Sequence, residues 1–494
     1  MPQSERGELK QTIAHGLAWK LLELTGAQGV QFAVALLLAR LMTPAEYGTI
    51  GLIGIFITIA NVFVQSGFAT ALVQAPEVEA EDYSSVLSIC LLIALPVYAM
   101  LFLGAPRVSA YYETPVLCPL LRAMGIVLFP GAVIAVQTAY VSRAMAFRRL
   151  FEATMFAVLV SGAAAVFLAL RGFGVWAMAA QQILYYFFLM FALLVRIAWR
   201  PGVCLNVGSV KKLFHFGWKI LASGLIDTIW MNVYGLVIGK RYSQAELGAY
   251  NRGEQFPKII TSNLSSAIQS VLFPVYARAQ SERETLRLMM KRSVQLAAFV
   301  IFPMMAGLAG CADSLVRVLL TERWLFCVPY LRVMCLCYAF WPIHVTNLQM
   351  INAMGRSDLF LKLEILKKAL GIVILILSLR YGVVAMLLLK AADEFLCTLI
   401  NAAPVGRLIR YGILEQYKDM LPATVSALLM GAIVWQLEGI LPTTAGLTLV
   451  LQILAGSASY LLISLFINRS SICFLREFKK RERKGSGKGG CGRA

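Results

Sequence analysis

Apolar runs of about 20 residues recur along almost the whole of this 494-residue chain. A helix that crosses the hydrocarbon core of a bilayer needs about 20 predominantly apolar residues, because each residue adds about 1.5 Å to its length. Charged residues make up 14% of the chain, whereas soluble proteins carry about 25%. The sequence therefore predicts an all-α integral membrane protein and excludes a large soluble domain.

The pattern predicts about fourteen transmembrane helices, joined by short connections that contain turn residues. The expected spans are residues 17–39, 48–73, 84–105, 118–141, 153–170, 175–197, 217–239, 248–276, 293–312, 328–352, 363–379, 383–405, 420–437 and 445–467. The first ten residues are polar and the following apolar run continues at spanning length, so we expect no cleavable signal peptide.

The positions of lysine and arginine predict the orientation of the spans, because cytoplasmic loops carry an excess of both residues. With the N-terminus inside, the inside segments hold 30 Lys and Arg and the outside segments hold 8. Both termini are therefore expected in the cytoplasm. The acidic connection 75–85 is the one inside segment that departs from this pattern, although acidic residues contribute little to the rule.

The net charge of +19 lies mainly in these inside segments and in the tail 468–494. Nucleic-acid binding would need a folded basic face with stacking aromatic residues, and no such segment is present in the sequence. We expect a disordered tail that lies against anionic membrane lipid, and no nucleic-acid partner.

The cysteines and histidines do not predict a metal site or an enzyme. The ten cysteines include no C-x-x-C pair, and the three histidines form no H-E-x-x-H motif. We expect no metal, no cofactor and no catalytic residues. The protein is therefore predicted not to be an enzyme.

An internal duplication organises the chain. Five short matches recur in the same order at offsets near 200 residues: 19–20 with 218–219, 45–48 with 245–248, 119–124 with 329–334, 144–145 with 353–354, and 173–178 with 381–386. The predicted domains are a six-helix lobe at 1–205, a second lobe at 206–415, two further helices at 416–467 and the tail.

A unit of six spans has the same orientation in both copies, which gives a parallel repeat about an axis along the membrane normal. Secondary transporters use such repeats for alternating access to a central cavity. We therefore interpret the chain as a transporter. The alternative is that duplication only builds a large helical bundle.

Ionisable residues within the expected spans are the candidate functional residues, because a charge at mid-membrane costs about 2.5–3.5 kcal/mol. The duplication relates Lys20 to Lys219 and Arg122 to Arg332, and residues related in this way would face a shared axis. The predicted cavity residues are Lys20, Lys219, Arg122, Arg332, Arg252, Lys258, Asn263 and Gln269. Residues that could couple an ion, H⁺ or Na⁺, or pair charges are Glu23, Asp227, Glu254, Lys390, Asp393 and Glu394.

Structural roles remain open for most of these residues. The two lysines and the two arginines of the repeat lie near the ends of their spans and could extend to the lipid headgroups. Glu254 and Lys258 have the i, i+4 spacing of a local ion pair, and Lys390 and Glu394 have the same spacing in the less favourable order.

The eighth span is too polar to face lipid on all sides. Its polar residues recur every three or four positions from Arg252 to Gln269, which predicts one hydrated stripe. Pro257 and Pro274 would bend this helix and could act as a hinge. Amide and hydroxyl side chains beside cations suit a ligand that contains both phosphate and sugar.

Several segments closely resemble the polysaccharide-transport (Wzx-like) flippases of the multidrug/oligosaccharidyl-lipid/polysaccharide exporter superfamily. They include "LLLARLMTPAEYGTIGL" (36–52), "SGFATALVQ" (66–74), "LGAYNRGEQFPKI" (247–259), "ERWLFCVPYLRVM" (322–334) and "AMGRSDLFLKLEILKK" (353–368). The resemblance runs from about residue 12 to about residue 420.

The resemblance implies an inner-membrane flippase for undecaprenyl-pyrophosphate-linked oligosaccharide units in lipopolysaccharide or exopolysaccharide biosynthesis. It also implies possible partners among polysaccharide polymerases and glycosyltransferases. Asn232 stands where relatives commonly have an acidic residue, which leaves the coupling ion open. The alternatives are a multidrug exporter of organic cations with the same fold, or a membrane enzyme of polysaccharide assembly.

Overall fold

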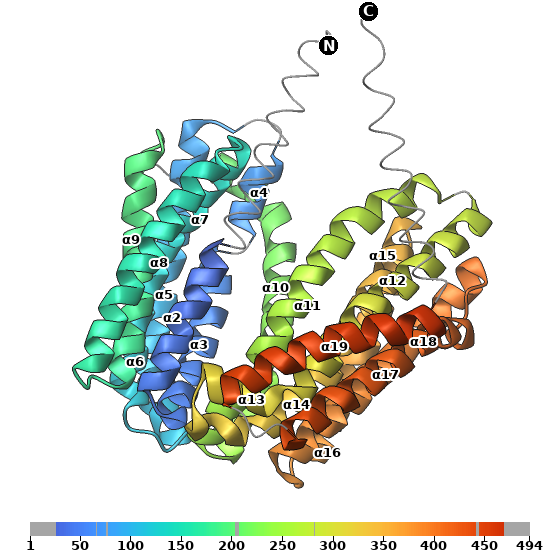
Figure 1. The fold of residues 1–494 in the computed structure, drawn as a ribbon. Coiled ribbons are helices and arrows are strands. Elements are labelled where there is room, and N and C mark those ends of the chain that lie inside the picture. The colour runs from blue at the N-terminus through green and yellow to red at the C-terminus, as the bar shows by residue number, and fades with distance from the viewer. Residues whose placement is uncertain are drawn as a thin grey trace, which may run out of the picture. The chain divides into compact units, whose positions relative to one another are not determined.

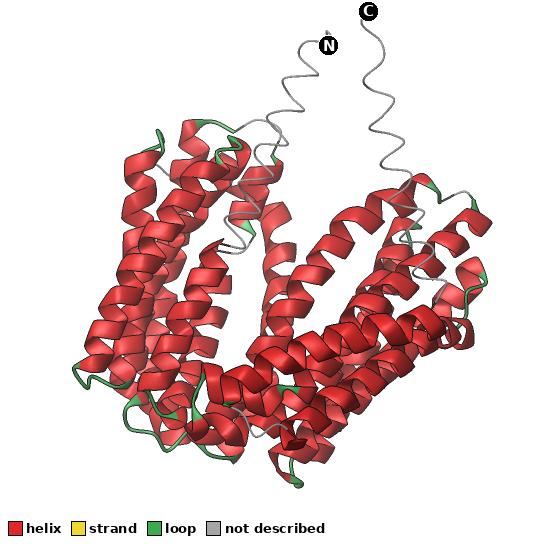
Figure 2. Cartoon of the chain, in the orientation of Figure 1, coloured by secondary structure: helices red, strands yellow, loops and turns green. Residues whose placement is uncertain are grey.

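A computed structural model of the chain describes residues 26–65, 67–75, 78–202, 207–280, 282–440 and 444–468, without the side chains of 203–216. All regular secondary structure among these residues is helical (Figure 2). The predicted all-α fold is therefore confirmed. The chain divides into two compact units, Met1–Gly248 and Ala249–Ala494.

The described part of unit 1 consists of helices that run from blue to green in Figure 1. They are α2 (Gln28–Leu41), α3 (Pro44–Gln65), α4 (Phe68–Gln74), α5 (Ala80–Tyr111), α6 (Leu117–Met124), the short η2 (Gly125–Val127), α7 (Leu128–Arg143), α8 (Phe147–Leu170), α9 (Val175–Arg196) and α10 (Val207–Arg241). One apolar core, which includes Val64, Val86, Val136 and Leu193, holds α3, α5, α7 and α9 together.

Helix α11 (Gln244–Arg278) begins in unit 1 and continues into unit 2. The remaining helices of unit 2 are α12 (Arg283–Gly310), α13 (Ala312–Leu319), η3 (Glu322–Cys327), α14 (Val328–Ala339), α15 (Trp341–Ala353), α16 (Ser357–Ser378), α17 (Gly382–Ile409), α18 (Ile413–Ile440) and α19 (Ala445–Ile467). Small residues let α12 and α18 approach closely, since a Cβ on Gly310 would lie 2.9 Å from the main-chain oxygen of Gly431.

Ten helical segments in the described part of the chain are long and apolar enough to cross a membrane. The other four of the fourteen predicted spans fall on α2, α11, α16 and α17. Helix α2 is described only from Gln28, and α11, α16 and α17 each carry several charged residues. The multi-pass architecture is confirmed. The predicted lobe boundaries and the cytoplasmic termini stay predictions, and the tail after Asn468 lies outside the described residues.

Several duplicated segments have the same local structure in both copies. The helical segment that contains the first Pro-x-Leu-Arg motif is interrupted by η2 after Met124, and the segment that contains the second is interrupted after Ala339. Each is followed by a turn with a residue of positive φ, Met145 at 52° in the first copy and Gly355 at 70° in the second. These matches are expected for two copies of one folding unit.

Within unit 1, the two copies of the Ala-Glu-Tyr/Leu-Gly motif pack against each other. A Cβ on Gly48 would lie 1.7 Å from the main-chain oxygen of Gln244, and a Cβ on Gly248 would lie 2.0 Å from that of Pro44. The first turns of α3 and α11 therefore meet backbone to backbone. This contact requires glycine at both positions.

Candidate functional site

Glu254 is the centre of a cluster of polar side chains in unit 2. Its Oε1 accepts hydrogen bonds from the hydroxyls of Tyr338 at 3.0 Å and Tyr250 at 3.3 Å. The Nζ of Lys390 lies 3.8 Å from Oε1, and the Nζ of Lys258 lies 3.6 Å from Oε2. We call these five residues the Glu254 cluster.

Three helices supply the cluster. Tyr250, Glu254 and Lys258 are spaced four residues apart, so they lie on one face of α11. Tyr338 comes from α14 and Lys390 from α17. The packing of these two helices on each other therefore brings residues far apart in the sequence to a single carboxylate.

The Glu254 cluster contains two cations and one anion. The side chains of Glu254 and Lys390 are 13% and 15% exposed, whereas that of Lys258 is 44% exposed. Lys390 thus compensates the buried carboxylate from inside the unit, and Lys258 presents its ammonium group at the surface of the unit. An accessible excess of positive charge within a spanning helix can bind an anionic group.

The polar stripe predicted on the eighth span lies on α11, and its C-terminal part is exposed on unit 2. Ser262, Asn263, Ser266, Gln269 and Ser270 are all exposed. Together with Lys258 they form the polar face of α11. Ser262, Ser266 and Ser270 donate hydrogen bonds to main-chain oxygens of their own helix. Their oxygens can still accept hydrogen bonds from sugar hydroxyls.

Arg252, also predicted for the cavity, is buried in unit 2. Its guanidinium group donates a hydrogen bond to the amide oxygen of Gln255 and lies 5.9 Å from the centre of the Trp324 ring. The polar stripe of α11 therefore starts inside unit 2 and becomes exposed beyond Lys258.

Arg122 and Arg332 occupy corresponding places in the two copies of the repeat. The Nε of Arg122 donates to the main-chain oxygen of Phe102 in α5 at 3.2 Å, and its guanidinium group stacks over the Phe102 ring. This oxygen lies four residues before Pro106, which has no N–H to bond it.

The Nε of Arg332 donates at 3.2 Å to the main-chain oxygen of Ala309, in the last turn of α12. Arg332 also pairs with Asp313. Each arginine thus bonds a main-chain oxygen, one in α5 and one in α12, that has no N–H partner within that helix. This matters in a membrane protein because lipid supplies no hydrogen-bond donors.

Apart from Arg122 of α6, the predicted site residues of unit 1 that the structure describes lie on α10. Lys219 and Asp227 are exposed on the unit, and the amide of Asn232 donates to the main-chain oxygen of Thr228 at 2.8 Å. Lys20 and Glu23 lie outside the described residues.

Asp393 and Glu394 lie on α17 beside polar residues that sequence reasoning did not select. Asp393 is buried and the side chain of Glu394 is 19% exposed. His344 of α15 contacts both Glu394 and Thr398. A signal was present in the sequence, because His344 and Asn347 are polar residues at helical spacing within a predicted span.

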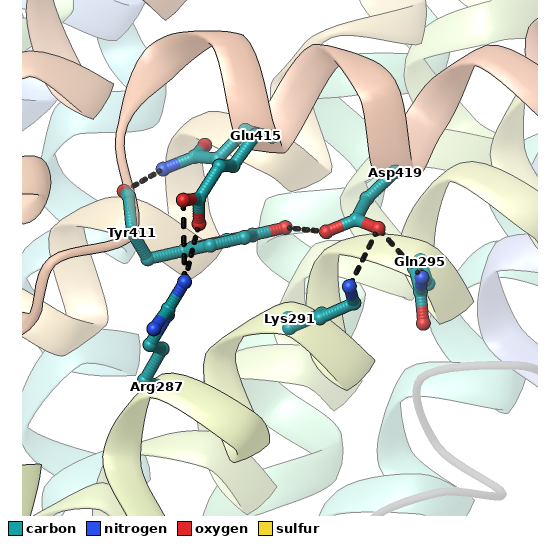
Figure 3. Close-up of polar contacts among 7 residues, drawn as sticks. Arg287, Lys291, Gln295, Tyr411, Glu415 and Asp419 are labelled. Carbon is teal, nitrogen blue, oxygen red and sulfur yellow. Dashed lines mark hydrogen bonds and ion pairs between the residues drawn. The ribbon is translucent and has the colours of Figure 1, made fainter. Parts of the chain in front are cut away.

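A second polar cluster joins α12 to α18 (Figure 3). Arg287 donates to both carboxylate oxygens of Glu415, at 3.2 and 3.0 Å. Lys291 lies 3.1 Å from Oδ1 of Asp419, whose Oδ2 accepts a hydrogen bond from the hydroxyl of Tyr411 at 2.8 Å. Gln295 donates to the same carboxylate at 3.0 Å. In the described part of the chain, no group of three or more acidic, His or Cys side chains could hold a metal ion.

These features define a class of protein before any comparison is made. The helices are long and apolar, unit 2 encloses ionisable side chains, and one helix exposes a cationic polar face. Such an arrangement is typical of a multi-pass membrane transporter, since ionisable groups within spans mark substrate or ion pathways.

Comparison with known proteins identifies the family. Residues 37–329 match the family model described as "Polysaccharide biosynthesis protein", and the chain belongs to this family. It is 26% identical over 325 residues to the succinoglycan biosynthesis transport protein ExoT of Rhizobium meliloti, an alignment that covers 66% of each chain, slightly less than two thirds. It is 25% identical over 356 residues to the teichuronic acid biosynthesis protein TuaB of Bacillus subtilis, covering 70% of this chain and 72% of that one.

A solved structure has the same fold. The inward closed conformation of the lipid II flippase MurJ matches with a TM-score of 0.73 at 14% sequence identity, over 92% of this chain and 100% of that chain. At this level of identity the likeness concerns the fold alone. The chain thus has the fold of that flippase, and the resemblance to Wzx-like proteins predicted from the sequence is confirmed.

Proposed function

We propose that this protein moves a polyprenyl-pyrophosphate-linked oligosaccharide from the cytoplasmic to the outer face of the plasma membrane, for the biosynthesis of a cell-surface polysaccharide. The observation that carries the proposal is the polar face of α11, on which an exposed Lys258 precedes Asn263 and Gln269. Membership of the polysaccharide biosynthesis family supports it.

The chemistry of the substrate fits this face. A pyrophosphate group carries two or three negative charges that cannot cross hydrocarbon without compensation. Lys258 can supply a charge-assisted hydrogen bond to it, while amide and hydroxyl groups bind the glycan. The polyprenyl tail remains in lipid throughout. Alternating access then requires only noncovalent binding and release, so we infer a transporter that is not an enzyme.

Further parts of the proposal concern setting and energy source. We infer a location in the plasma (inner) membrane with both termini in the cytoplasm. The coupling ion would be H⁺ or Na⁺, with no other cofactor. Partners would be membrane lipid and, on either side of the flipping step, glycosyltransferases and a polysaccharide polymerase.

The test is a complementation experiment in a strain that lacks this protein. We expect the deletion strain to accumulate a lipid-linked oligosaccharide on the cytoplasmic side, measured by extraction of the lipid and accessibility of its glycan to a membrane-impermeant reagent. Lys258→Ala should fail to restore surface polysaccharide at normal membrane levels of the protein, and Lys258→Arg should restore most of it.

The matched control is Lys418→Ala, because Lys418 is exposed at the start of α18, away from the polar face of α11. It should complement fully. A deletion strain that exports all its surface glycans normally would refute the proposed function. Full complementation by Lys258→Ala would refute the role of Lys258 alone.

A further inference from the structure

Unit 2 encloses a series of polar side chains, all but one of them buried, that the proposed flipping step does not use. They lie on α15, α17 and α18. We call this series the interior track; its members are Glu394, His344, Thr398, Asn401, Asn347 and Gln416.

His344 is buried between two partners from α17. Its Nε2 lies 2.7 Å from Oγ1 of Thr398, and its Nδ1 lies 3.8 Å from Oε2 of Glu394. The hydroxyl of Thr398 donates its own hydrogen to the main-chain oxygen of Glu394 at 3.0 Å. The hydroxyl oxygen is therefore the acceptor for His344, and Nε2 carries the proton.

This assignment of the tautomer leaves Nδ1 as the basic nitrogen of the neutral ring. Nδ1 faces the Glu394 carboxyl group at 3.8 Å, which is too long for a direct hydrogen bond and suits a bridging water or a small movement. A proton bound at Nδ1 gives an imidazolium–carboxylate pair with Glu394.

Asn401 indicates that water enters this part of unit 2. It is fully buried on α17, one turn beyond Thr398, and neither its amide nitrogen nor its amide oxygen has a hydrogen-bond partner within the described part of the chain. Buried amides are rarely left unsatisfied, and in a polar interior the usual partner is an ordered water molecule.

The interior track continues toward the cluster between α12 and α18. Asn347, one turn along α15 from His344, exchanges hydrogen bonds with Gln416 at 3.1 and 3.0 Å. Gln416 donates at 3.4 Å to the main-chain oxygen of Tyr411, whose hydroxyl bonds Asp419 (Figure 3). Asp419 in turn pairs with Lys291, which is 47% exposed.

We propose that His344 and Glu394 form a proton-binding site inside unit 2, and that the interior track, with water at Asn401, connects it to the aqueous surface at Asp419. The step is reversible protonation, so it requires no further reactant. It specifies the coupling ion as a proton, and to that extent it rests on the proposed function.

Charged groups on the helices around His344 set the electrostatic environment of this site. On α16, Lys367 pairs with Glu364 at 2.5 Å, and on α14 Arg332 pairs with Asp313. On α12, Arg287 and Lys291 pair with carboxylates of α18. The other charged residues of α12, α16 and α17 are Asp358, Lys362 and Lys368 on α16, Arg283, Glu284 and Arg292 on α12, and Lys390, Asp393, Glu394 and Arg407 on α17 itself. The charge of Lys367 acts on the ring of His344, and Glu394 is the acidic group in contact with that ring.

The first test observes the proton directly. The chain has three histidines, so a His15→Gln, His215→Gln variant of the full protein in nanodiscs, labelled with ¹⁵N-histidine, reports His344 alone. Between about pH 9 and pH 5, we expect Nδ1 to change reversibly from unprotonated to protonated while Nε2 remains protonated. Glu394→Gln should shift the midpoint of this titration.

An imidazole of His344 that stays neutral over the whole range, or that titrates with the same midpoint in Glu394→Gln, would overturn the proposal. So would an unprotonated Nε2 at high pH. These outcomes concern only the proton site, because the measurement involves no lipid-linked substrate.

The second test measures proton movement in proteoliposomes with an enclosed pH-sensitive dye and an imposed membrane potential. Wild-type protein should acidify or alkalinise the lumen according to the sign of the potential. His344→Gln should reduce this movement to the level of protein-free liposomes, and His215→Gln should leave it unchanged.

Asn401→Leu separates a role in proton transfer from a structural role. It removes an amide that has no hydrogen-bond partner among the described protein groups, so the thermal stability should stay equal or rise, while proton movement should be slowed. If Asn401→Leu and His344→Gln both retain wild-type proton movement, the inference fails even when glycan export is normal. Proton movement that depends on His344 in a protein whose deletion leaves glycan export intact would refute the proposed function and keep the proton site.

Discussion

The mutual packing of Gly48 and Gly248 predicts a large effect from a single methyl group. In Gly48→Ala the new Cβ would lie 1.7 Å from the main-chain oxygen of Gln244, against about 3.4 Å for an ordinary contact. Relief of the clash requires a movement of 1.7 Å (3.4 minus 1.7). The obstacle is backbone in the first turn of a helix, so no flexible side chain can give way.

Overpacking of this kind costs about 1–3 kcal/mol, and we expect the upper part of that range. For a unit of about 250 residues, this corresponds to a fall of about 2–12 °C in the midpoint of thermal unfolding. The assay is thermal unfolding of the purified protein in nanodiscs, followed by intrinsic tryptophan fluorescence. The matched control is Gly54→Ala in the same helix α3, where a Cβ would meet nothing within 4 Å.

Gly54→Ala should leave the midpoint unchanged or raise it, because alanine is favoured over glycine by about 1 kcal/mol within a helix. Gly248→Ala should destabilise in the same way as Gly48→Ala. The double variant should lose less than the sum of the two single variants, since one separation of the helices relieves both clashes. Equal midpoints for Gly48→Ala and Gly54→Ala would show that the first turns of α3 and α11 do not meet as described.

Three further predictions concern polar contacts, each measured by the same unfolding assay. Arg122→Met should destabilise by about 1.5–3 kcal/mol because the main-chain oxygen of Phe102 loses its donor. Adding Pro106→Ala supplies a helix N–H to that oxygen and should recover part of the loss. A double variant whose stability is the strict sum of the two single effects would contradict this. Lys390→Met should destabilise by about 3 kcal/mol, because the carboxylate of Glu254 loses the cation beside it. Adding Glu254→Gln should restore stability, and a double variant that is no more stable than Lys390→Met would show that the two residues are not coupled. Burial and the nearby Asp419 carboxylate raise the pKa of Tyr411 well above its usual range, so its hydroxyl stays protonated and Tyr411→Phe should cost about 1.5–3 kcal/mol at any pH between about 6 and 9; a stability equal to wild type would mean that this hydrogen bond contributes nothing.

Two kinds of sequence pattern were sufficient to predict many of the long helices of this protein. The length of an apolar run depends only on the thickness of the bilayer, so spans such as 84–105 and 153–170 could be placed before the structure was known. The spacing of polar residues on α11 likewise depends only on the helix itself, and its C-terminal part is exposed as one face.

Contacts between distant segments could not be predicted in the same way. His344 lies in a predicted span, and its partners Glu394 and Thr398 lie 50 and 54 residues further along the chain. The sequence around His344 does not indicate these partners, and only the packing of α15 on α17 brings the three side chains together. The same holds for the amide pair of Asn347 and Gln416.

The duplicated cations illustrate a further limit of sequence patterns. A charge that recurs in both copies of a repeat can serve a substrate on the shared axis, or it can meet a need that each copy has separately. Arg122 and Arg332 each bond a carbonyl group that a helix leaves without a partner, and this need arises twice because the helices themselves are duplicated. The first copy has no basic residue at the position that corresponds to Lys258, where α3 is largely apolar. The ammonium group of Lys258 is the more exposed cation of the Glu254 cluster, so it is the residue on which the proposed binding of a phosphorylated substrate depends most.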